Sequence, residues 1–516
     1  MIALSFSTLL ALCLQSAPTA STMSADEVRG NVRRAVGFDR IAAQSTGLRA
    51  SGTSAIFGNE NASGLIFDGR GRFVSEFAGP IRYGLGFNGK EAWSMEFGGQ
   101  PRLLELGERA AALLVGAAMT GAWLAPDSPL QFTVDAAHSD DAKVTLTYKN
   151  SPGFESGLIE IDRQTWLPRR FTIEGSGSGT RDLSFEGVRE FNGIKLPARI
   201  QDHGTGGQDF SQKVETLAAA PTFIRSPYDM PPAPTDDIHF AAGVSEQLEI
   251  ERAPTGHLLV RPKVNGRQMG WFIVDTGAGA TVLDSSVAAD LNLKKLGGVQ
   301  ALGVGGAMES SLYQLESFEV GAVKLERGIV ITLDLAFLNI PLGHEIAGVL
   351  GFDLLSRCVV EFDFAGGHVA LHDPAKFKDP GLTWDRLYLP GRIPAVAGKF
   401  EGHEGILRLD SGKSGQALTM HYPAVQQFKL LEGRETTTSS AGGVGGRVPT
   451  AVGRLKSVEF AGQKIDDLEV GFVTEPRGAF ADAYAAGVMG APLLQRFTIV
   501  LDYPGRRIAF RANKQP

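Results

Sequence analysis

The sequence contains very little cysteine: only Cys13 and Cys358 occur among its 516 residues. Cys13 lies in an apolar N-terminal run, so removal of that run would leave Cys358 alone. A single cysteine cannot form an internal disulfide, and the fold therefore needs no disulfide even in an oxidising compartment. Cys358 sits among apolar residues, and we expect it to pack as a small hydrophobic side chain.

Apolar runs long enough to span a bilayer are also lacking, because the stretches at residues 2–14 and 110–125 are both short. We interpret residues 1–22 as an export signal peptide, since small residues follow the first apolar run. This predicts a periplasmic or secreted protein. The alternative is a buried N-terminal segment. The second stretch predicts a buried helix.

The chain has neither a basic block nor a set of residues with metal-ligand spacing. Its net charge is −7 and its pI is near 5.8, which argues against nucleic acid as a partner. The segment 412–414 (GKS) resembles part of a phosphate-binding loop, but that motif requires glycine at position 407, where Leu407 stands. We therefore expect neither a metal nor another cofactor.

Glycine is abundant, with 64 residues, and together with few long helical patterns this predicts a turn-rich, mostly β fold. Residues 23–225 predict a β-rich N-terminal domain. Ser24 and Glu27 have the spacing of a capping box, and Val28, Val32 and Val36 follow at helical spacing. Alternating residues predict strands at 64–68, 72–77, 144–148, 158–162, 170–174 and 194–200.

The N-terminal domain has the order helix, strands, buried helix and strands, and it contains two characteristic short segments, residues 161–168 (IDRQTWLP) and 193–197 (GIKLP). Together they resemble the curved half-barrel of periplasmic lipoprotein-carrier proteins. The resemblance implies a concave sheet that holds an acyl chain or an extended peptide, and hence a lipid or lipoprotein partner. The alternative is a spacer or docking domain with a filled core. Residues 226–250 predict a proline-rich linker.

The second half of the chain contains an internal repeat. Gly351 precedes Asp363 by 12 residues, and Gly490 precedes Asp502 by the same 12. Five matched features occur in the same order, which indicates a duplication: Pro-x-Val-x-Gly (262–266, 394–398), Asp-Thr/Ser-Gly (275–277, 410–412), a glycine-rich tip (303–306, 442–446), an apolar-Gly segment ending in Leu-Leu (347–355, 486–494), and a strand with an acidic residue (361–364, 500–503). We assign Asp363 and Asp502 to the ends of their strands.

These features resemble the aspartic peptidases over about residues 251–514. The glycine-rich tips resemble the retroviral-type members, whereas two halves in one chain resemble the pepsin arrangement. The resemblance implies a bilobal acid-protease double barrel in a monomer that acts on polypeptides. Its first lobe would cover residues 251–374 and its second lobe residues 393–514, with a connection at 375–392.

By this resemblance, Asp275 and Asp410 form a catalytic dyad. Two carboxyls that hold one water cannot both ionise cheaply, so they share a proton and titrate as a pair. A single half therefore has no catalytic unit. The resemblance implies the following roles for neighbouring residues: cross-linking of the turns by Thr276 and Ser411, close packing at Gly277 and Gly412, and flap tips at Gly303, Gly305, Gly306, Gly443, Gly445 and Gly446.

Two residues depart from the family pattern. Ala278 lacks the hydroxyl that pepsin-like enzymes place there, and losing that hydrogen bond should raise the lower pKa of the pair. We therefore expect a mildly acidic to neutral optimum. Lys413 stands where the family keeps a small residue. We expect its amine to extend outward into water, while an inward amine would hold both aspartates ionised.

Three functions follow. The first is an exported aspartic endopeptidase. The second is a catalytically inactive peptidase fold, disabled at Lys413, that binds peptides or lipidated polypeptides together with the N-terminal domain. The third is a carrier whose N-terminal half does the work.

Overall fold

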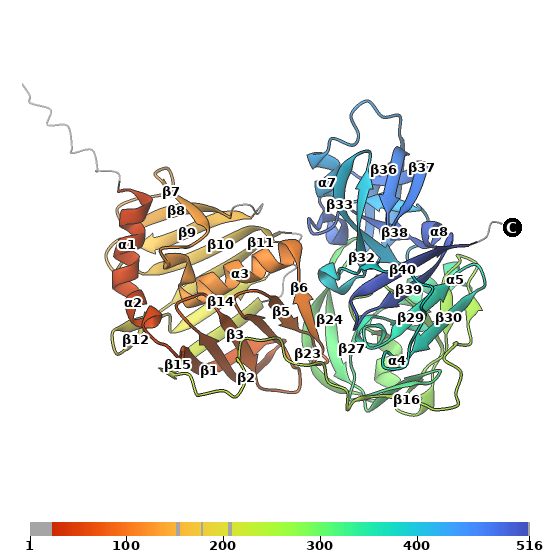
Figure 1. Ribbon diagram of the computed structural model, residues 1–516, viewed down its shortest axis with the longest axis horizontal. Helices are drawn as coiled ribbons and strands as arrows, with labels where there is room; N and C mark the ends of the chain where they lie inside the picture. The colour runs from red at the N-terminus through yellow and green to blue at the C-terminus, as the bar shows by residue number, and fades with distance from the viewer. Residues whose placement is uncertain (1–22, 151–154, 177–178, 205–208, 514–516) are drawn as a thin grey trace, which may run out of the picture.

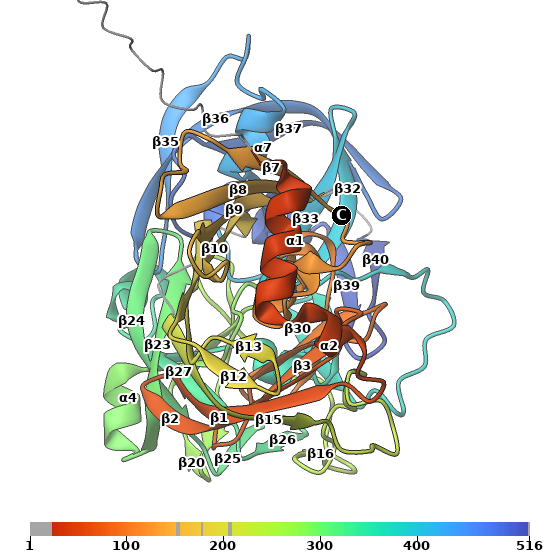
Figure 2. The same ribbon diagram turned by 90° about the vertical axis from the view of Figure 1, so that its left-hand side faces the viewer.

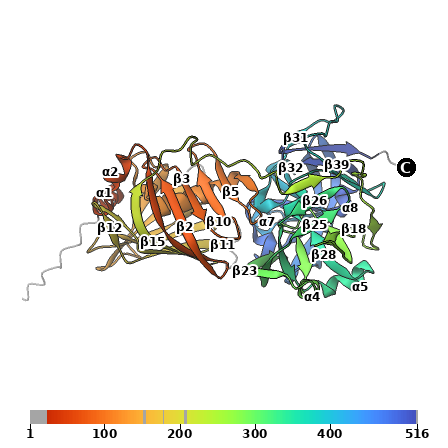
Figure 3. The same cartoon turned by 90° about the horizontal axis from the view of Figure 1, so that it is seen from below.

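We describe a computed structural model for residues 23–150, 155–176, 179–204 and 209–513. The predicted signal peptide lies outside these ranges. The chain is mostly β, as predicted, and its sheets gather in an N-terminal and a C-terminal region that lie side by side along the long axis (Figures 1 and 3). No helix in the described ranges is long and apolar enough to cross a membrane.

The N-terminal region is built on one antiparallel sheet of 13 strands. Across the sheet the order is β6 (Pro101–Leu104), β5 (Ala92–Met95), β4 (Gly84–Phe87), β3 (Phe73–Phe77), β2 (Asn59–Phe67), β1 (Leu48–Ile56), β15 (Asp209–Ala219), β14 (Arg199–His203), β11 (Gly179–Glu186), β10 (Pro168–Ser176), β9 (Ser156–Asp162), β8 (Lys143–Asn150) and β7 (Leu130–Asp135).

A short hairpin, β12 (Arg189–Phe191) and β13 (Ile194–Leu196), stands apart from this sheet. The sequence predicted one strand over residues 194–200, but the structure divides it into β13 and β14. Pro197 lies at the break, and proline has no backbone N–H to donate to a ladder.

The first helix, α1 (Ala25–Val36), has the predicted capping box. The Glu27 N–H donates to Ser24 Oγ at 3.2 Å, and the Ser24 N–H donates to Glu27 Oε2 at 2.7 Å. Gly37 ends this helix with a φ of 72°, and α2 (Phe38–Ala42) follows in a new direction. A Cβ at Gly37 would lie only 2.1 Å from the Gly193 carbonyl oxygen, so glycine is required at this position.

The predicted buried helix is α3 (Leu106–Thr120), followed by the 3₁₀ turn η1 (Ala122–Leu124). It contacts β10 and also β4, β5 and β6, which lie far away in strand order. Both sets of strands can reach one helix only because the sheet curls around it, as Figures 1 and 2 show. A Cβ at Gly116 of α3 would lie 2.1 Å from the Phe73 ring, so helix and sheet are in close contact.

The C-terminal region has two large sheets. The first contains β17 (Glu251–Arg252), β18 (Leu258–Val260), β21 (Trp271–Val274), β28 (Ile346–Leu350), β22 (Val282–Asp284), β27 (Ile329–Leu333), β24 (Gly306–Gln314) and β23 (Lys294–Gly303) in that order. The second contains β32 (Ala395–Phe400), β33 (His403–Asp410), β38 (Gly487–Gly490), β34 (Leu418–Met420), β37 (Gln463–Val473), β36 (Gly446–Phe460) and β35 (Thr437–Gly443), and β32 also pairs with β36, which closes a barrel.

Corresponding strands of the repeat pair in the same way in the two sheets. β21 is parallel to β28, and β22 is antiparallel to β28 and parallel to β27. In the second sheet β33 is likewise parallel to β38, and β34 is antiparallel to β38 and parallel to β37. Each aspartate turn thus follows a strand held between two neighbours.

Two five-stranded sheets complete the region. One runs β16 (Ile238–Phe240), β26 (Val323–Glu326), β25 (Ser317–Val320), β19 (Lys263–Val264) and β20 (Arg267–Gln268), so the segment predicted as a linker contributes a strand. The other runs β30 (His368–His372), β29 (Val359–Asp363), β39 (Phe497–Asp502), β40 (Arg507–Ala512) and β31 (Asp385–Arg386).

In the second of these sheets, β29 from the first lobe pairs with β39 from the second, from Val359 opposite Asp502 to Asp363 opposite Thr498. Asp363 and Asp502 close the turns that follow their own strands, as predicted: their Oδ1 atoms accept the Gly366 and Gly505 N–H groups at 2.9 and 2.8 Å.

The remaining helices are short: α4 (Ser285–Asp290), η2 (Ala336–Leu338), α5 (Asn339–Leu342), α6 (Phe352–Leu355), η3 (Pro390–Arg392), α7 (Tyr422–Gln427), η4 (Gly478–Ala481) and α8 (Ala491–Leu494). One continuous apolar core spans both lobes of the C-terminal region, and a separate core fills the N-terminal sheet. Cys358 is fully buried in the C-terminal core, as expected, and burial raises the pKa of its thiol.

Candidate active site

The two Asp-Thr/Ser-Gly turns meet where the lobes face each other. Asp275 follows β21, and its N–H donates to the Leu350 carbonyl at the end of β28, 3.0 Å away. Asp410 ends β33, and the parallel neighbour β38 lies beside it, with Gly490 opposite. Both side chains are partly accessible. Each carboxyl is therefore carried by the end of a strand that is paired on both sides.

Thr276 and Ser411 link the two turns through four hydrogen bonds. The Thr276 N–H donates to Ser411 Oγ at 2.9 Å, and the Ser411 N–H donates to Thr276 Oγ1 at 3.0 Å. The hydroxyls in turn donate to carbonyls of the opposite strand, Thr276 to Leu409 at 2.8 Å and Ser411 to Val274 at 2.8 Å. Both side chains are buried, so this cross-link fixes the distance between the aspartates.

Gly277 and Gly412 lie directly against the opposite carboxyl group. A Cβ at Gly277 would lie 2.4 Å from Asp410 Cγ, and a Cβ at Gly412 would lie 2.4 Å from Asp275 Cγ. Gly277 also donates its N–H to Asp275 Oδ1 at 2.7 Å. Any side chain at either glycine would push the two carboxyls apart.

Both carboxyls hold protons more tightly than ordinary aspartates. Burial raises the pKa of Asp275, and hydrogen bonds from neighbouring backbone N–H groups oppose it only in part. Burial, reinforced by the charge of Asp275, raises the pKa of Asp410 well above its usual range. Each carboxyl also acts on the pKa of the other. Two carboxyls this close can share one proton and titrate as a pair.

Lys413 does not extend into water, so the expectation of an outward amine is wrong. Its Nζ donates to the Gln416 carbonyl at 2.6 Å, because the chain turns back at Gly415, where φ is 88°. Burial lowers the pKa of Lys413 to about 8, opposed by the charge of Asp410. The amine thus lies close enough to lower the pKa of Asp410, but burial outweighs this effect.

The two glycine-rich tips touch each other. One joins β23 to β24 and the other joins β35 to β36, and the Gly305 N–H donates to the Val444 carbonyl at 3.0 Å. Close approach explains the glycines: a Cβ at Gly303 would lie 2.3 Å from the Val444 oxygen, and one at Gly305 would lie 2.0 Å from the Gly445 oxygen. Gly306, Gly443 and Gly446 complete the two hairpin tips.

Each tip places a valine in the opposite lobe. Val304 packs against Val448, Val473, Phe480 and Val488 of the second lobe. Val444 packs against an apolar cluster of the first lobe that also borders Ala278, next to the first aspartate turn. Arg477 reinforces this arrangement, because its Nε donates to the Gly305 carbonyl at 2.7 Å.

No sequence pattern pointed to two supporting residues of this site. His257 is buried and its Nε2 lies 2.8 Å from the Gly412 carbonyl, while its Nδ1 lies 2.6 Å from Thr255 Oγ1. Asp353 accepts the Thr281 N–H at 2.5 Å, and burial raises its pKa to about 6. His257 belongs to no motif. Asp353 is the acidic residue of the apolar segment 347–355, and the corresponding position in the second copy of that segment is Pro492.

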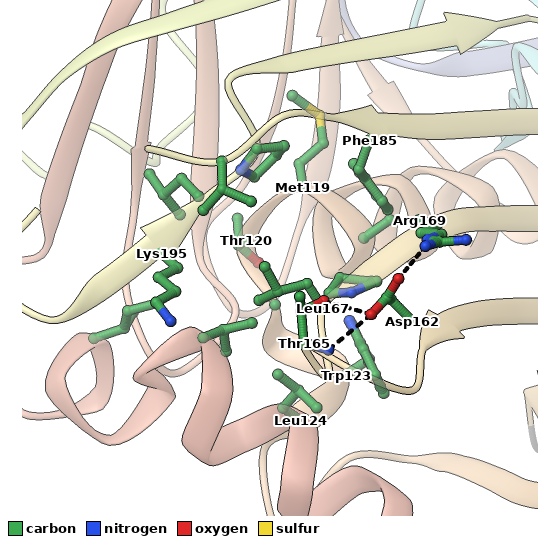
Figure 4. A pocket seen from close by; sticks show the side chains of 18 of the residues that line it. Met119, Thr120, Trp123, Leu124, Asp162, Thr165, Leu167, Arg169, Phe185 and Lys195 are labelled. Atoms are coloured by element: carbon green, nitrogen blue, oxygen red, sulfur yellow. Dashed lines mark hydrogen bonds and ion pairs between the residues drawn. The ribbon is translucent and has the colours of Figure 1, made fainter. Parts of the chain in front are cut away.

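A second candidate site lies in the N-terminal region (Figure 4). It is an apolar cavity of about 220 Å³ between the end of α3, η1 and the loops of the curled sheet, with Met119, Trp123 and Leu167 among its walls. Asp162 lies at its edge, but its Oδ1 closes the turn after β9 by accepting the Thr165 N–H at 2.7 Å, and Arg169 pairs with its other oxygen. The cavity thus offers apolar contact mainly.

Residues 260–354 match the family model described as aspartyl protease. The match includes the first aspartate turn, the first glycine-rich tip and all but the last residue of the segment that ends in Leu-Leu. This part of the chain is therefore aspartyl protease-like, and the second aspartate turn, at residues 410–412, lies outside the match. No curated protein matches the sequence.

Among solved structures, a LolA superfamily protein from Nitrosomonas europaea matches with 15% identity and a TM-score of 0.28. The alignment covers 39% of this chain and 95% of that protein. A TM-score this low does not establish a shared fold. Within the described ranges, no group of three or more His, Cys, Asp or Glu side chains is placed to hold a metal ion.

Proposed function

We propose that this protein is an exported aspartic endopeptidase that hydrolyses peptide bonds with a water molecule held between Asp275 and Asp410. The observation that carries the proposal is the packing of each carboxyl against the glycine of the opposite turn, 2.4 Å from the position of a Cβ. This packing brings two partly buried carboxyls close enough to share a proton, which a structural turn aspartate has no need to do.

The two carboxyls take different roles in the proposed reaction. Asp275, ionised, takes a proton from the water as its oxygen attacks the peptide carbonyl carbon. Asp410, protonated, donates to the carbonyl oxygen and stabilises the tetrahedral intermediate. When the C–N bond breaks, the proton on Asp275 passes to the leaving nitrogen, and Asp410 recovers a proton from the hydroxyl of the intermediate. Burial of both carboxyls favours an optimum in the mildly acidic to neutral range.

The substrate we propose is an extended polypeptide. The flap hairpins carry backbone N–H and C=O groups that can pair with a substrate strand, while side pockets read alternate side chains. Because the tips interlock through Val304 and Val444, they must separate before a chain reaches the dyad. An unfolded segment or a loop satisfies this requirement better than a folded domain.

Digestion of casein and of an unfolded peptide mixture by the full chain, with and without pepstatin, tests the proposal. We expect cleavage with an optimum between about pH 5 and 7 and inhibition by pepstatin, because both depend on a dyad that shares a proton. Cleavage that pepstatin does not affect, or an optimum confined to very low pH, would contradict this reaction. Complete absence of cleavage would favour the binding function below.

Lys413→Met is expected to move the pH profile of cleavage toward higher pH. The lysine charge lowers the pKa of Asp410, so its removal lets the dyad keep its shared proton to higher pH. Methionine keeps most of the side-chain volume. The profile of kcat/KM against pH is the measurement, and Lys399→Met, at an exposed position on β32, is the matched control. An unchanged profile, or one displaced toward acid, would show that the amine does not lower the pKa of the dyad.

A second candidate function is binding without cleavage, favoured by the apolar cavity of the N-terminal region. At about 220 Å³ it is smaller than the ~300–1,000 Å³ of typical small-molecule sites, so it suits one or two apolar side chains or part of an acyl chain. In this function the cavity would take an apolar group of a peptide or lipidated polypeptide, and the peptidase-like region would hold the chain. Binding of a fluorescent fatty acid, weakened by Met119→Glu, tests it.

A further inference from the structure

The turn η3 contacts the segment just after the first aspartate turn and the strand that leads into the second. On one side, a Cβ at Gly279 of the first turn would lie 3.2 Å from Arg392 Nε and 3.4 Å from the Gly391 carbonyl oxygen. On the other side, Arg408, two residues before Asp410, donates from Nη2 to the Pro390 carbonyl at 3.0 Å. A displacement of η3 would therefore shift the chain next to both carboxyls.

Residues of the N-terminal region hold this turn. Arg102, on β6, donates from Nη1 to the Leu389 carbonyl at 2.8 Å. Glu108, on α3, accepts the Gly391 N–H at 3.1 Å. Glu96 pairs with Arg392 at 3.6 Å. The guanidinium of Arg392 also lies over the ring of Phe97, 5.5 Å from its centre. Figure 1 shows β5 and β6 at the side of the N-terminal sheet that faces the C-terminal region.

These charged groups form one buried network. Arg102 pairs with Glu96 at 3.0 Å and with Glu108 at 2.7 Å, and the three side chains are only 7%, 10% and 13% exposed. Buried charges at such distances are held in place, because moving one partner leaves the other unpaired in a poorly solvated site. The carboxyl of Glu96 also acts on Asp353, which holds the Thr281 N–H behind the first turn.

We infer that Glu96, Arg102 and Glu108 are positioning residues of the peptidase, which makes the N-terminal region part of the catalytic unit rather than only a neighbouring domain. They hold η3 against both aspartate turns and so maintain the spacing of the carboxyls. This inference rests on the proposed endopeptidase function, because the spacing matters only if the carboxyls act together.

Arg102→Gln in the full chain tests the inference. It removes the charge that joins Glu96 to Glu108 and the bond to the Leu389 carbonyl. We expect kcat to fall by about 10-fold or more with KM changed by less than about 2-fold, because misplaced catalytic groups slow the chemical step more than they weaken substrate binding. Arg102→Lys keeps the charge but cannot form all the contacts, and we expect an intermediate kcat.

Arg386→Gln is the matched control. It breaks the exposed ion pair between Arg386 and Glu105, which also joins the two regions but touches neither aspartate turn. We expect kcat to stay within about 2-fold of the wild type. Equal loss of kcat in Arg386→Gln and Arg102→Gln would overturn the inference, because a general weakening of the contact between the regions would then explain both.

Hydrogen exchange of backbone amides in residues 275–281 and 408–412 provides a second measurement that needs no activity. We expect faster exchange there in Arg102→Gln and not in Arg386→Gln, with the rest of the C-terminal core unchanged. Unchanged exchange in these turns would overturn the inference even if kcat falls. If the wild type cleaves nothing, the proposed function fails, but the exchange result still decides whether the N-terminal residues position the turns.

Discussion

Asp275→Asn and Asp410→Asn are each expected to abolish peptide cleavage, with kcat reduced on the order of 10⁴-fold or more. Asparagine has nearly the shape of aspartate but can neither accept the water proton at Asp275 nor supply the shared proton at Asp410. The two losses should be equally severe and should not add in the double variant, because neither carboxyl works alone. Steady-state kinetics with one unstructured peptide measures all three variants.

Stability shows whether these variants are folded. Burial raises the pKa of both aspartates in the folded state. Protonation of these groups therefore stabilises the folded state fully below the unfolded-state pKa of about 3.9, and this stability is lost as pH rises through the pKa values of the folded state. Asparagine cannot ionise, so the variants do not lose this stability as pH rises. At pH 7 each variant should therefore unfold at the same or a higher urea concentration than the wild type.

Asp466→Asn, at an exposed position on β37, is the control for both measurements and should change neither. Persistent cleavage in Asp275→Asn or Asp410→Asn would exclude a shared-proton mechanism. Lower urea resistance at pH 7 in these two variants alone would show that the carboxyls stabilise the fold as a charged pair, contrary to the raised pKa values.

Gly412→Ala is expected to lower kcat/KM by about 10²-fold or more. The new Cβ would lie 2.4 Å from Asp275 Cγ, far inside the distance at which two carbon atoms can touch. The turn must move by about 1 Å to relieve this contact, and a displacement of that size in a catalytic group costs about 10²-fold in rate. Gly277→Ala should have the same effect from the other side, through Asp410.

The pH profile distinguishes this displacement from simple loss of folded protein. Separated carboxyls repel each other less, so the alkaline limb of any residual activity in Gly412→Ala should move to lower pH. Gly30→Ala, in α1, is the control, because its Cβ would meet nothing closer than 3.7 Å. A Gly412→Ala variant with wild-type kcat/KM would mean that the two turns do not approach as described.

Local sequence was sufficient to place the aspartate turns. A β-branched and aromatic strand before Asp275 and a glycine after it determine a strand end by themselves, and the repeat supplied the second copy. The capping box of α1, the buried helix α3 and the strand ends at Asp363 and Asp502 were predicted for the same reason.

What the sequence could not predict depends on contacts between distant residues. Lys413 turns inward because the chain reverses at Gly415 and presents a carbonyl to the amine, a geometry that no spacing rule expresses. Arg102 and Leu389 are separated by 287 positions, so their hydrogen bond had no local signal. The contact of Gly305 with Val444 likewise needs both lobes in place.

The ladder between β29 and β39 has a consequence for how the two lobes stay associated. Five consecutive residue pairs, from Val359 opposite Asp502 to Asp363 opposite Thr498, form a seam inside a shared sheet. The continuous apolar core crosses the same boundary. Covalent continuity through the connecting segment is therefore not what keeps the lobes together. A chain severed there would remain a tight non-covalent pair, as two separate polypeptides that complement each other do.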